Sequence, residues 1–406
     1  MITPPETIFE VVTRLQEAGH EAWLVGGCVR DRLLGRWPGD WDVTTNAEPE
    51  VVMGLFERTV PTGLQHGTVT VVLGDEVVEV TTYRVDGDYT DGRRPDSVRF
   101  TRSLDEDLAR RDFTMNAMAW DPVRDVLADP FGGRRDLDDR LIRAVGDAQA
   151  RFTEDGLRPL RAVRFQAVLD FAIEASTLDA IPRTLKTFRQ VSAERIRVEL
   201  YKILASDHAG RALLVLSQTG LLKAAMPAVG QLPDPGLSHI AGALTPPLPT
   251  VDRLALLLRP VADEADGVLR ALRVSNEDRR RVLALLRVAE EPANPPTDAA
   301  VRALVARVTP TLLDAWLAWR AAWDHDDAPW RALAARIDAL AARDRPLTAG
   351  DLALDGKALM AQAGLAPSRR VGQVQAWLLE RVWEDPSINT EAGLVRLIPA
   401  ALAAVP

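Results

Sequence analysis

The sequence predicts an α+β protein in which a head with a mixed β-sheet precedes an all-helical body and tail. Two observations carry this prediction. Between residues 22 and 82, valine-rich runs typical of strands alternate with short helical patterns. Beyond Arg151, leucine, alanine and arginine recur at helical spacing, and almost no strand signal remains. With 406 residues, of which 47% are hydrophobic, the chain is long enough for two or more domains with cores of their own.

Composition and charge narrow the class of protein. The chain has no apolar run of 18 residues, and its start, Met-Ile-Thr-Pro-Pro-Glu, lacks the basic and apolar stretches of a signal peptide. Its one cysteine, Cys28, excludes an internal disulfide and is expected to be a packing residue. We therefore expect a soluble cytoplasmic protein without membrane contact, and we predict no stable protein partner. The net charge of −9 argues against indiscriminate adhesion to polyanions, although a local basic groove could still bind nucleic acid.

Strand and helix patterns follow one another along the first hundred residues. Apolar residues at helical spacing predict a helix over residues 5–19, and residues 22–25 are typical of a strand. A second helix is expected over 49–56, after the typical start Glu48-Pro49. The runs 68–73 and 77–82 predict a hairpin through Gly74-Asp75-Glu76. Residues 83–100 are polar and have no apolar period, so we expect a functional loop there.

Gly26 and Gly27 lie where the strand 22–25 passes into a short helix. Glycines at such a turn let the backbone approach a phosphate, and the free N–H groups at the start of the helix favour an anion. Arg30 follows one turn later, and its fork of donors can bind phosphate oxygens. The three residues together predict a phosphate-binding turn.

Asp40 and Asp42 are expected on the next strand, where residues two apart project to the same side. Two such carboxylates can hold Mg²⁺, which prefers one or two carboxylates together with substrate phosphates. Glu79 is the one charge inside the strand 77–82, and it is either an exposed strand position or a third acid that faces the pair. The residues therefore predict a magnesium site at Asp40 and Asp42 and leave the role of Glu79 open.

The pattern Leu-Val-Gly-Gly-Cys-Val-Arg-Asp-Arg-Leu-Leu-Gly, followed by Asp-Trp-Asp-Val-Thr-Thr, resembles the signature of the polymerase-β-like nucleotidyltransferase superfamily. Within it, the chain looks like the bacterial class II tRNA nucleotidyltransferases and poly(A) polymerases. The run Arg-Arg-Asp-Phe-Thr-Met-Asn-Ala over residues 110–117 resembles a second motif of that family. The resemblance implies a polymerase-β-like head and catalytic roles for Asp40, Asp42 and Glu79. It also implies nucleotide contacts from Gly26, Gly27, Arg30, Arg111, Asp112 and Asn116.

The segment Glu154-Asp155-Gly156-Leu157-Arg158 resembles the family's Glu-Asp-x-x-Arg motif, at the entry of a helix expected to start near Leu157. In the family, this aspartate and arginine hydrogen-bond the Watson–Crick edge of the incoming nucleotide. A carboxylate beside a guanidinium complements the amino donor and ring-nitrogen acceptor that cytosine and adenine share. The resemblance thus implies that Asp155 and Arg158 select CTP or ATP, and that Arg161 and Arg164 contact the triphosphate or the template. From the residues alone, the arginines could also form a solvated basic face.

The same helix carries an apolar stripe that predicts core packing, made of Leu157, Leu160, Val163, Ala167, Val168 and Phe171. Downstream, Ser192 to Leu200 resembles the family's next motif. Its acid and arginine, here Glu194 and Arg195, brace the template helix in the family. An ion-paired structural role is what the residues alone indicate as well.

We divide the chain into a nucleotidyltransferase head (1–145), neck helices that carry the template (146–230), a body (231–345) and a tail that binds tRNA (346–406). Some relatives carry a phosphohydrolase domain with a His-Asp pair, but here the five histidines show no ligand spacing, so the body is expected to be a degenerate version. Proline clusters at 246–249 and 292–296 predict linkers. Four tryptophans at near-helical spacing are expected in the core: Trp316, Trp319, Trp323 and Trp330.

The resemblance implies an enzyme that adds CCA to the 3′ end of tRNA without a nucleic-acid template. CTP and ATP would be its donors, Mg²⁺ its cofactor and pyrophosphate the product released. Residues 88–95 keep a loop that relatives adding only CC lack, which favours addition of the terminal A by a full CCA enzyme or by an A-adding partner. A poly(A) polymerase is less favoured, because such relatives tend to carry basic extensions. The alternatives from other classes are a catalytically inactive RNA- or nucleotide-binding regulator and a nucleotidyltransferase for a small molecule or a protein.

Overall fold

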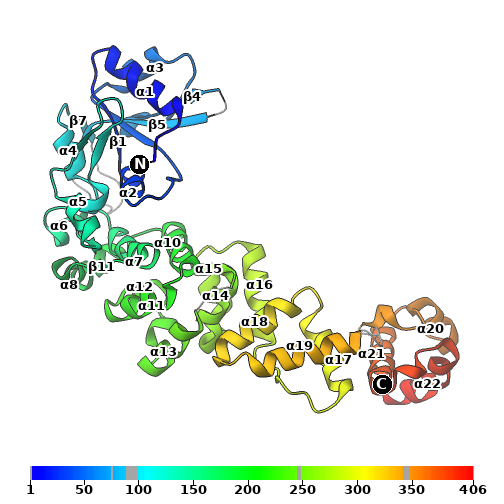
Figure 1. Ribbon diagram of the computed structural model, residues 1–406. Coiled ribbons are helices and arrows are strands. Elements are labelled where there is room, and N and C mark those ends of the chain that lie inside the picture. Colours follow the sequence, from blue (N-terminus) through cyan, green and yellow to red (C-terminus); the bar gives the residue numbers. More distant parts are fainter. Residues whose placement is uncertain (1, 75, 88–97, 245–247, 342–347, 406) are drawn as a thin grey trace. The chain divides into compact units, whose positions relative to one another are not determined.

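The computed structural model describes residues 2–74, 76–87, 98–244, 248–341 and 348–405 (Figure 1). The chain divides into two compact units, one formed by Met1–Leu232 with Ala271–Arg273 and the other by Pro233–Arg270 with Val274–Pro406. The finer division into head, neck, body and tail stays a prediction. No helix in the described part of the chain is long and apolar enough to cross a membrane.

A seven-stranded sheet in the first unit has the order β3-β4-β5-β2-β1-β8-β9. Among its neighbours β2 and β5 run parallel and the other pairs run antiparallel, which confirms the predicted mixed sheet. The strands of this sheet are β1 (Ala22–Val25), β2 (Asp42–Thr45), β3 (Thr59–Gly63), β4 (Thr68–Leu73), β5 (Glu76–Thr82), β8 (Ala119–Asp121) and β9 (Val126–Ala128).

The hairpin of β4 and β5 forms as predicted, because alternate valines on both strands project into the core. Val69 and Val71 of β4 pair with Val80 and Val78 of β5, and all four are buried. Asp75 of the connecting turn lies outside the described residues. The strands β3, β8 and β9 were not predicted. Two of them have only three residues each, and β3 contains Pro61 and Gly63, which is tolerated because β3 is an edge strand.

Twelve α-helices complete the first unit in the described residues. The helices α1 and α3 form over the residues that the sequence patterns predicted. In Figure 1 both lie above the sheet and α2 lies below it. Their bounds are α1 (Glu6–Glu17), α2 (Gly27–Leu33), α3 (Pro49–Leu55), α4 (Leu104–Ala109), α5 (Gly133–Asp138), α6 (Ala148–Glu154), α7 (Arg158–Leu169), α8 (Ala175–Arg183), α9 (Leu185–Phe188), α10 (Ala193–Ala205), α11 (Ala209–Gln218) and α12 (Leu221–Ala225). In α2, Cys28 is buried and donates to the Val25 carbonyl, and burial raises the pKa of its thiol to about 11, which fits a packing residue.

The loop expected over residues 83–100 begins and ends as a pair of strands. β6 (Arg84–Asp86) and β7 (Val98–Phe100) are antiparallel, so the expectation of a loop is wrong at both ends of this stretch. Each strand has three residues, too few for an alternating pattern to show in the sequence. Residues 88–95, which carried the prediction of terminal A addition, lie outside the described residues.

The helix α7 starts one residue after the predicted Leu157 and has Pro159 in its first turn, where a proline costs no hydrogen bond. Most of the predicted stripe is buried, but Val168 is 42% exposed, so its assignment to the core is wrong. The helix ends at Leu169, so Phe171 does not belong to its stripe. Asp170 adopts a left-handed conformation, and Phe171, which follows it, is buried. The short strands β10 (Leu141–Ile142) and β11 (Ala172–Ile173) pair in parallel beside it.

In its described residues the second unit consists of helices and the segments that connect them, without a strand, as predicted. Its helices are α13 (Asp234–Ala243), α14 (Thr250–Leu258), α15 (Ala265–Ala271, whose last residue belongs to the first unit), α16 (Asn276–Arg287), α17 (Asp298–Val308), α18 (Leu313–Asp324), α19 (Ala328–Ala341), α20 (Gly356–Ala363), α21 (Arg369–Glu384) and α22 (Glu391–Ala404). The prolines between 292 and 296 lie in the irregular link between α16 and α17, as predicted, whereas the cluster at 246–249 falls partly on residues outside the described part.

Trp316, Trp319 and Trp330 are buried, which confirms the prediction of core packing, and Trp323 is half-buried. The histidines are less scattered than the sequence indicated. The rings of His239 and His325 lie 4.6 Å apart, and His239 packs edge-on against Trp323. Within the described residues, however, no group of three or more His, Cys, Asp or Glu side chains could hold a metal ion.

We predict that Gly156→Ala destabilises the first unit, because the added Cβ would lie 2.6 Å from the Thr187 carbonyl oxygen and 2.9 Å from the Phe188 nitrogen. Overpacking against backbone of this kind costs about 1–3 kcal/mol. Thermal unfolding of the parent, of this variant and of a control variant measures the effect. The control is Gly54→Ala in α3, where no atom lies within 4 Å of the added Cβ and the melting temperature should hold or rise slightly. Equal melting temperatures for all three proteins would contradict the packing at Gly156.

Candidate active site

A cavity of about 410 Å³ in the first unit gathers the residues that the sequence motifs singled out. Six arginines and three aspartates line it, so its walls carry more positive than negative charge. Such a cavity suits a polyanion. Its lining consists of Gly26, Gly27, Arg30, Asp42, Arg110, Arg111, Asp112, Asn116, Asp155, Arg158, Arg161, Arg164 and Phe165.

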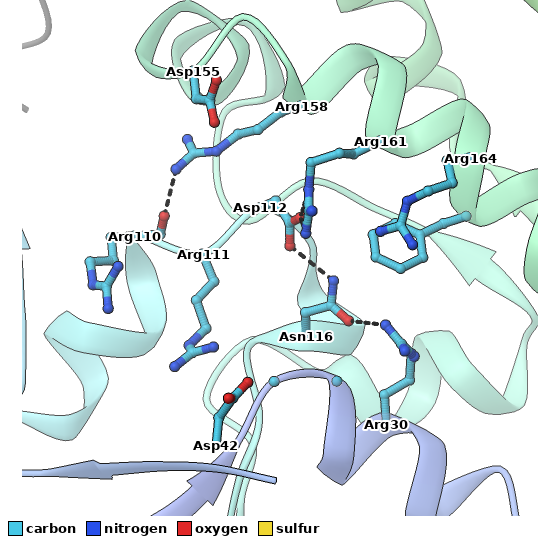
Figure 2. A pocket seen from close by; sticks show the side chains of 13 residues that line it. Arg30, Asp42, Arg110, Arg111, Asp112, Asn116, Asp155, Arg158, Arg161 and Arg164 are labelled. Carbon is cyan, nitrogen blue, oxygen red and sulfur yellow. Dashed lines mark hydrogen bonds and ion pairs between the residues drawn. The ribbon is translucent and has the colours of Figure 1, made fainter. Parts of the chain in front are cut away.

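Gly26 makes room for an arginine at the bottom of the cavity. Its φ of 76° and ψ of −128° form a backbone conformation that only glycine adopts readily. A Cβ at Gly26 would lie 2.9 Å from Nη1 of Arg111, whose side chain extends toward Asp42 in Figure 2. The glycine turn therefore admits a cation as well as leaving space for a phosphate. The helix α2 follows directly, and the N–H groups of its first turn have no partner within the helix.

Asp107 anchors Arg110 and Arg111, the two arginines with which the second motif begins. It is fully buried and forms ion pairs with Arg110 at 2.8 Å and with Arg111 at 3.5 Å. Burial alone would raise the pKa of Asp107, but the charges of both arginines, the hydrogen bond from Arg110 and the Arg84 backbone N–H hold it below its usual value. Sequence reasoning missed Asp107. The available signal was its position four residues before Arg111, at the spacing of a helical ion pair.

A chain of hydrogen bonds joins α2 to α7 across the cavity (Figure 2). Nη1 of Arg30 donates to Oδ1 of Asn116 at 2.8 Å, and Nδ2 of Asn116 donates to Oδ1 of Asp112 at 2.9 Å. Nε of Arg161 donates to the other carboxylate oxygen of Asp112 at 2.8 Å. Although burial opposes it, the Arg161 charge and these hydrogen bonds lower the pKa of Asp112 to about 2, so Asp112 stays ionised. The structure thus assigns Asp112 and Asn116 a direct part in orienting two arginines.

Phe165 and Glu199 hold the far end of this arrangement. Glu199 is buried and forms ion pairs with Arg164 and, at 3.8 Å, with Arg161. The Arg164 guanidinium lies 3.8 Å from the centre of the Phe165 ring, and that of Arg30 lies 5.1 Å from it. Both residues stood inside recognised motifs without an assigned role. Nothing in their local spacing showed that one ring would lie beside several arginines.

Asp155 and Arg158 both line the cavity, but each has other partners. Oδ2 of Asp155 accepts from Nη2 of Arg195 at 2.7 Å, and its other oxygen accepts from the Leu157 N–H at 3.0 Å. Arg158 donates to the Arg110 carbonyl at 2.8 Å, which ties α7 to the second motif. The prediction that Arg195 braces this region is confirmed. Its neighbour Glu194 instead lies 4.0 Å from Arg273, so the bracing acid among these helices is Glu199.

The carboxylates predicted to bind metal are arranged differently from the expectation. Asp42 is the first residue of β2, whereas Asp40 lies two residues before the strand and is exposed, so strand alternation does not place the two on one side. Glu79 of β5 is the direct neighbour of Asp42 in the parallel pair, and paired residues project to the same face. Of the three acids, only Asp42 lines the cavity.

Electrostatics nevertheless link the three acids. Burial raises the pKa of the Asp42 carboxyl, the nearby Arg111 opposes this, and the charges of Glu79 and Asp40 raise it further. A divalent cation would relieve this repulsion, and carboxylate oxygens are the donors that Mg²⁺ prefers. Because the described residues contain no complete metal-binding group, substrate phosphates would have to supply further ligands, as is usual for Mg²⁺.

Known protein families match the parts of the chain that contain most of these motifs. Residues 22–143 match the poly(A) polymerase head domain, and residues 170–232 match a family described as a probable RNA- and SrmB-binding site of polymerase A. The CCA-adding enzyme of Geobacillus stearothermophilus is 48% identical over 221 residues, which make up 54% of this chain and 54% of that enzyme. The matched part thus spans about half the length of this curated relative.

Solved structures resemble the chain over nearly its whole length. The crystal structure of the Bacillus stearothermophilus CCA-adding enzyme in complex with CTP has a TM-score of 0.78 and 33% identity and covers 99% of both chains. The Thermotoga maritima CCA-adding enzyme complexed with tRNA has a TM-score of 0.69 at 20% identity, over 98% of this chain and 95% of that one, which shows the shared fold. With both sequence motifs in one cavity and 33% identity to a solved member over 99% of its length, the chain belongs to the family of bacterial tRNA nucleotidyltransferases and poly(A) polymerases.

Proposed function

We propose that this protein is a CCA-adding tRNA nucleotidyltransferase, which extends the 3′ end of tRNA with CTP and ATP and releases pyrophosphate. The observation that carries the proposal is the single cavity in which Asp42, the Asp155/Arg158 pair and five further arginines come together. A triphosphate, a reacting 3′-hydroxyl and a base edge need these three kinds of group. The relatives with CTP and with tRNA in their solved structures support the same substrates.

The arginines of the cavity bind the triphosphate. Arg30 and Arg161 are held at opposite ends of the Asn116–Asp112 bridge, so their guanidinium groups are oriented before the nucleotide arrives. Preorganised donors bind a charged substrate better than mobile ones because less side-chain freedom is lost on binding. Arg111, held by Asp107 beside Gly26, extends the cationic wall toward Asp42.

Asp155 and Arg158 read the base. Their carboxylate and guanidinium pair with the amino donor and the ring-nitrogen acceptor of cytosine or adenine. Uracil and guanine present the reverse pattern and would leave a buried partner unpaired, which disfavours them strongly. Because Arg195 holds Asp155 and the Arg110 carbonyl holds Arg158, the two side chains keep their positions without a nucleic-acid template.

Asp42 lies in the cavity, next to Glu79 and near Asp40. Asp42 would hold Mg²⁺ together with the substrate phosphates and with Asp40, and whether Glu79 also binds the ion stays open. A divalent ion held there supplies, when bound, activation of the RNA 3′-hydroxyl and charge stabilisation for the in-line displacement of pyrophosphate. The chain's own residues position the ion and the phosphates relative to one another. We also propose a cytoplasmic location, in keeping with the free, buried Cys28.

Alternatives within the family are an A-adding specialist and a poly(A) polymerase. A different class is an inactive regulator that binds RNA or nucleotide, and the presence of Asp42, Arg111, Asp155 and Arg158 in one cavity speaks against it. A nucleotidyltransferase for a small molecule or a protein is disfavoured by the match of residues 170–232 to a probable RNA-binding family.

Incorporation into three tRNA transcripts, ending before CCA, after C and after CC, tests the proposed function. We expect all three to be completed when CTP and ATP are supplied together, because one pocket complements both bases. With CTP alone, the first two transcripts should stop at CC. Sequencing-gel analysis of the products measures this. Extension of the CC-ending tRNA alone would show an A-adding specialist, ATP-only tails on any RNA would show a poly(A) polymerase, and no incorporation would contradict the proposal.

We predict that Asp42→Asn lowers the incorporation rate by at least about 10³-fold, because a metal-held phosphate and hydroxyl contribute several kcal/mol to the transition state. tRNA affinity should remain, which separates catalysis from binding. The control Asp105→Asn removes an exposed carboxylate of α4 and should leave the rate unchanged.

The pH profile provides a second readout of Asp42. Its pKa is raised, so the parent enzyme should lose activity on the acid side at a higher pH than an ordinary aspartate would cause. Raising the Mg²⁺ concentration should move this acid limb to lower pH, because metal and proton compete for the carboxylate. An acid limb that does not respond to Mg²⁺, or full activity of Asp42→Asn, would contradict the role given to Asp42.

A further inference from the structure

A second cavity, of about 620 Å³, adjoins the nucleotide pocket along α7. Arg164 lines both cavities, so the second begins where the first ends. The first is lined by α7 residues up to Phe165 and the second by residues from Arg164 to Leu169. Other walls come from Arg36, which follows α2, from Arg140 before β10 and from the end of α10 at Lys202. None of the sequence motifs assigned a role to this place.

The charges of this second cavity are mostly unpaired cations. Arg36, Arg140 and Lys202 are exposed, and none of them forms an ion pair with a residue in the described part of the chain. Two acids also line the cavity. Asp170 is paired with Arg211 at 2.9 Å, whereas Asp207 forms no ion pair with a described residue, so three unpaired cations stand against one unpaired carboxylate. These three cations gather at one cavity although the chain as a whole has a net charge of −9. They provide the chemistry of a phosphate site.

Val168 gives the cavity an apolar side as well. It was expected in the core, yet it is 42% exposed and lines this cavity together with Ala167. An exposed aliphatic side chain beside cations suits a ligand that carries a sugar next to its phosphate, and inorganic phosphate or pyrophosphate would leave it unused. A nucleotide unit of a polynucleotide has both parts.

We propose that the second cavity binds one nucleotide of the RNA substrate, with Arg36, Arg140 and Lys202 on the backbone phosphate and Val168 against the ribose. The inference rests on the proposed function, since it takes the substrate to be RNA. Residues 170–232, which include Lys202, match a family described as a probable RNA-binding site. Because the cavity adjoins the nucleotide pocket, RNA held there is kept close to the site of addition. Arg36, Arg140 and Lys202 are therefore positioning residues for the RNA, distinct from the residues that hold the incoming nucleotide.

The test measures affinity of the full chain for a tRNA transcript that ends before CCA, by filter binding at several salt concentrations. Arg140→Gln and Lys202→Gln should each weaken binding about fivefold, which corresponds to an exposed ion pair at the upper end of its usual strength. Each should also reduce the slope of log affinity against log salt by about 0.7, the value for one phosphate contact on a single strand. The KM for CTP should stay unchanged. The matched control is Arg58→Gln, which removes an exposed arginine of the head, outside both cavities, and should change neither quantity.

A second pair of variants adds charge instead of removing it. Val168→Asp places a carboxylate in the cavity and should weaken tRNA binding at least as much as Lys202→Gln. Val123→Asp, at a valine that is 48% exposed and lies outside the cavity, should leave tRNA binding unchanged. Thermal unfolding of both confirms that they are folded.

Two results would overturn the inference. Cavity variants that bind tRNA as Arg58→Gln does would show that no RNA phosphate lies there. Variants that change the KM for CTP or the inhibition by pyrophosphate while tRNA affinity holds would assign the cavity to free phosphates. These outcomes differ from failure of the proposed function, in which the parent protein itself would not extend tRNA even if the cavity variants lost RNA affinity.

Discussion

The bridge from Arg30 through Asn116 and Asp112 to Arg161 is the interaction on which the rest of the site depends. It joins residues from α2, from the second sequence motif and from α7, which are far apart in the sequence. Asp112 is buried and has a lowered pKa, and it accepts hydrogen bonds from Asn116, Arg161 and the Phe113 N–H. Removing Arg161 would therefore leave this buried charge without its ion-pair partner. Such a bridge specifies one arrangement of α2, the second motif and α7, because few other packings would satisfy all of its donors and acceptors.

Two further buried carboxylates extend the same principle to the other arginines. Asp107 forms ion pairs with Arg110 and Arg111, and Glu199 forms them with Arg164 and Arg161. Buried acids thus hold four of the arginines that line the cavity in position: Arg110, Arg111, Arg161 and Arg164. This explains how an acidic protein presents a site for a polyanion. The net charge of the chain is negative, and positive charge is concentrated in the lining of this cavity.

Much of the architecture could be predicted from the sequence. The β4–β5 hairpin, the start of α7 and the helical second unit follow from periodicity, which depends on local chemistry alone. The grouping of Gly26, Arg30, Arg111, Asp155 and Arg158 followed from motifs quoted residue by residue. The predictions that were wrong concern features that depend on contacts between residues far apart in the sequence. Asp40 does not lie on the strand with Asp42, Val168 faces a cavity, and three short strands form only because a neighbouring strand offers partners. The roles of Phe165 and Glu199 depend on tertiary contacts that no spacing reveals, whereas the spacing of Asp107 and Arg111 did offer a signal.

The central claim is that the protein itself, without RNA, selects the base. Calorimetric titration of the full chain with CTP, ATP, UTP and GTP in the absence of tRNA tests it most directly. The account predicts that CTP and ATP bind at least about tenfold more tightly than UTP and GTP, because the wrong base edges leave Asp155 or Arg158 unpaired. Equal affinity for all four nucleotides would contradict it and would move base selection to the RNA or to a later step.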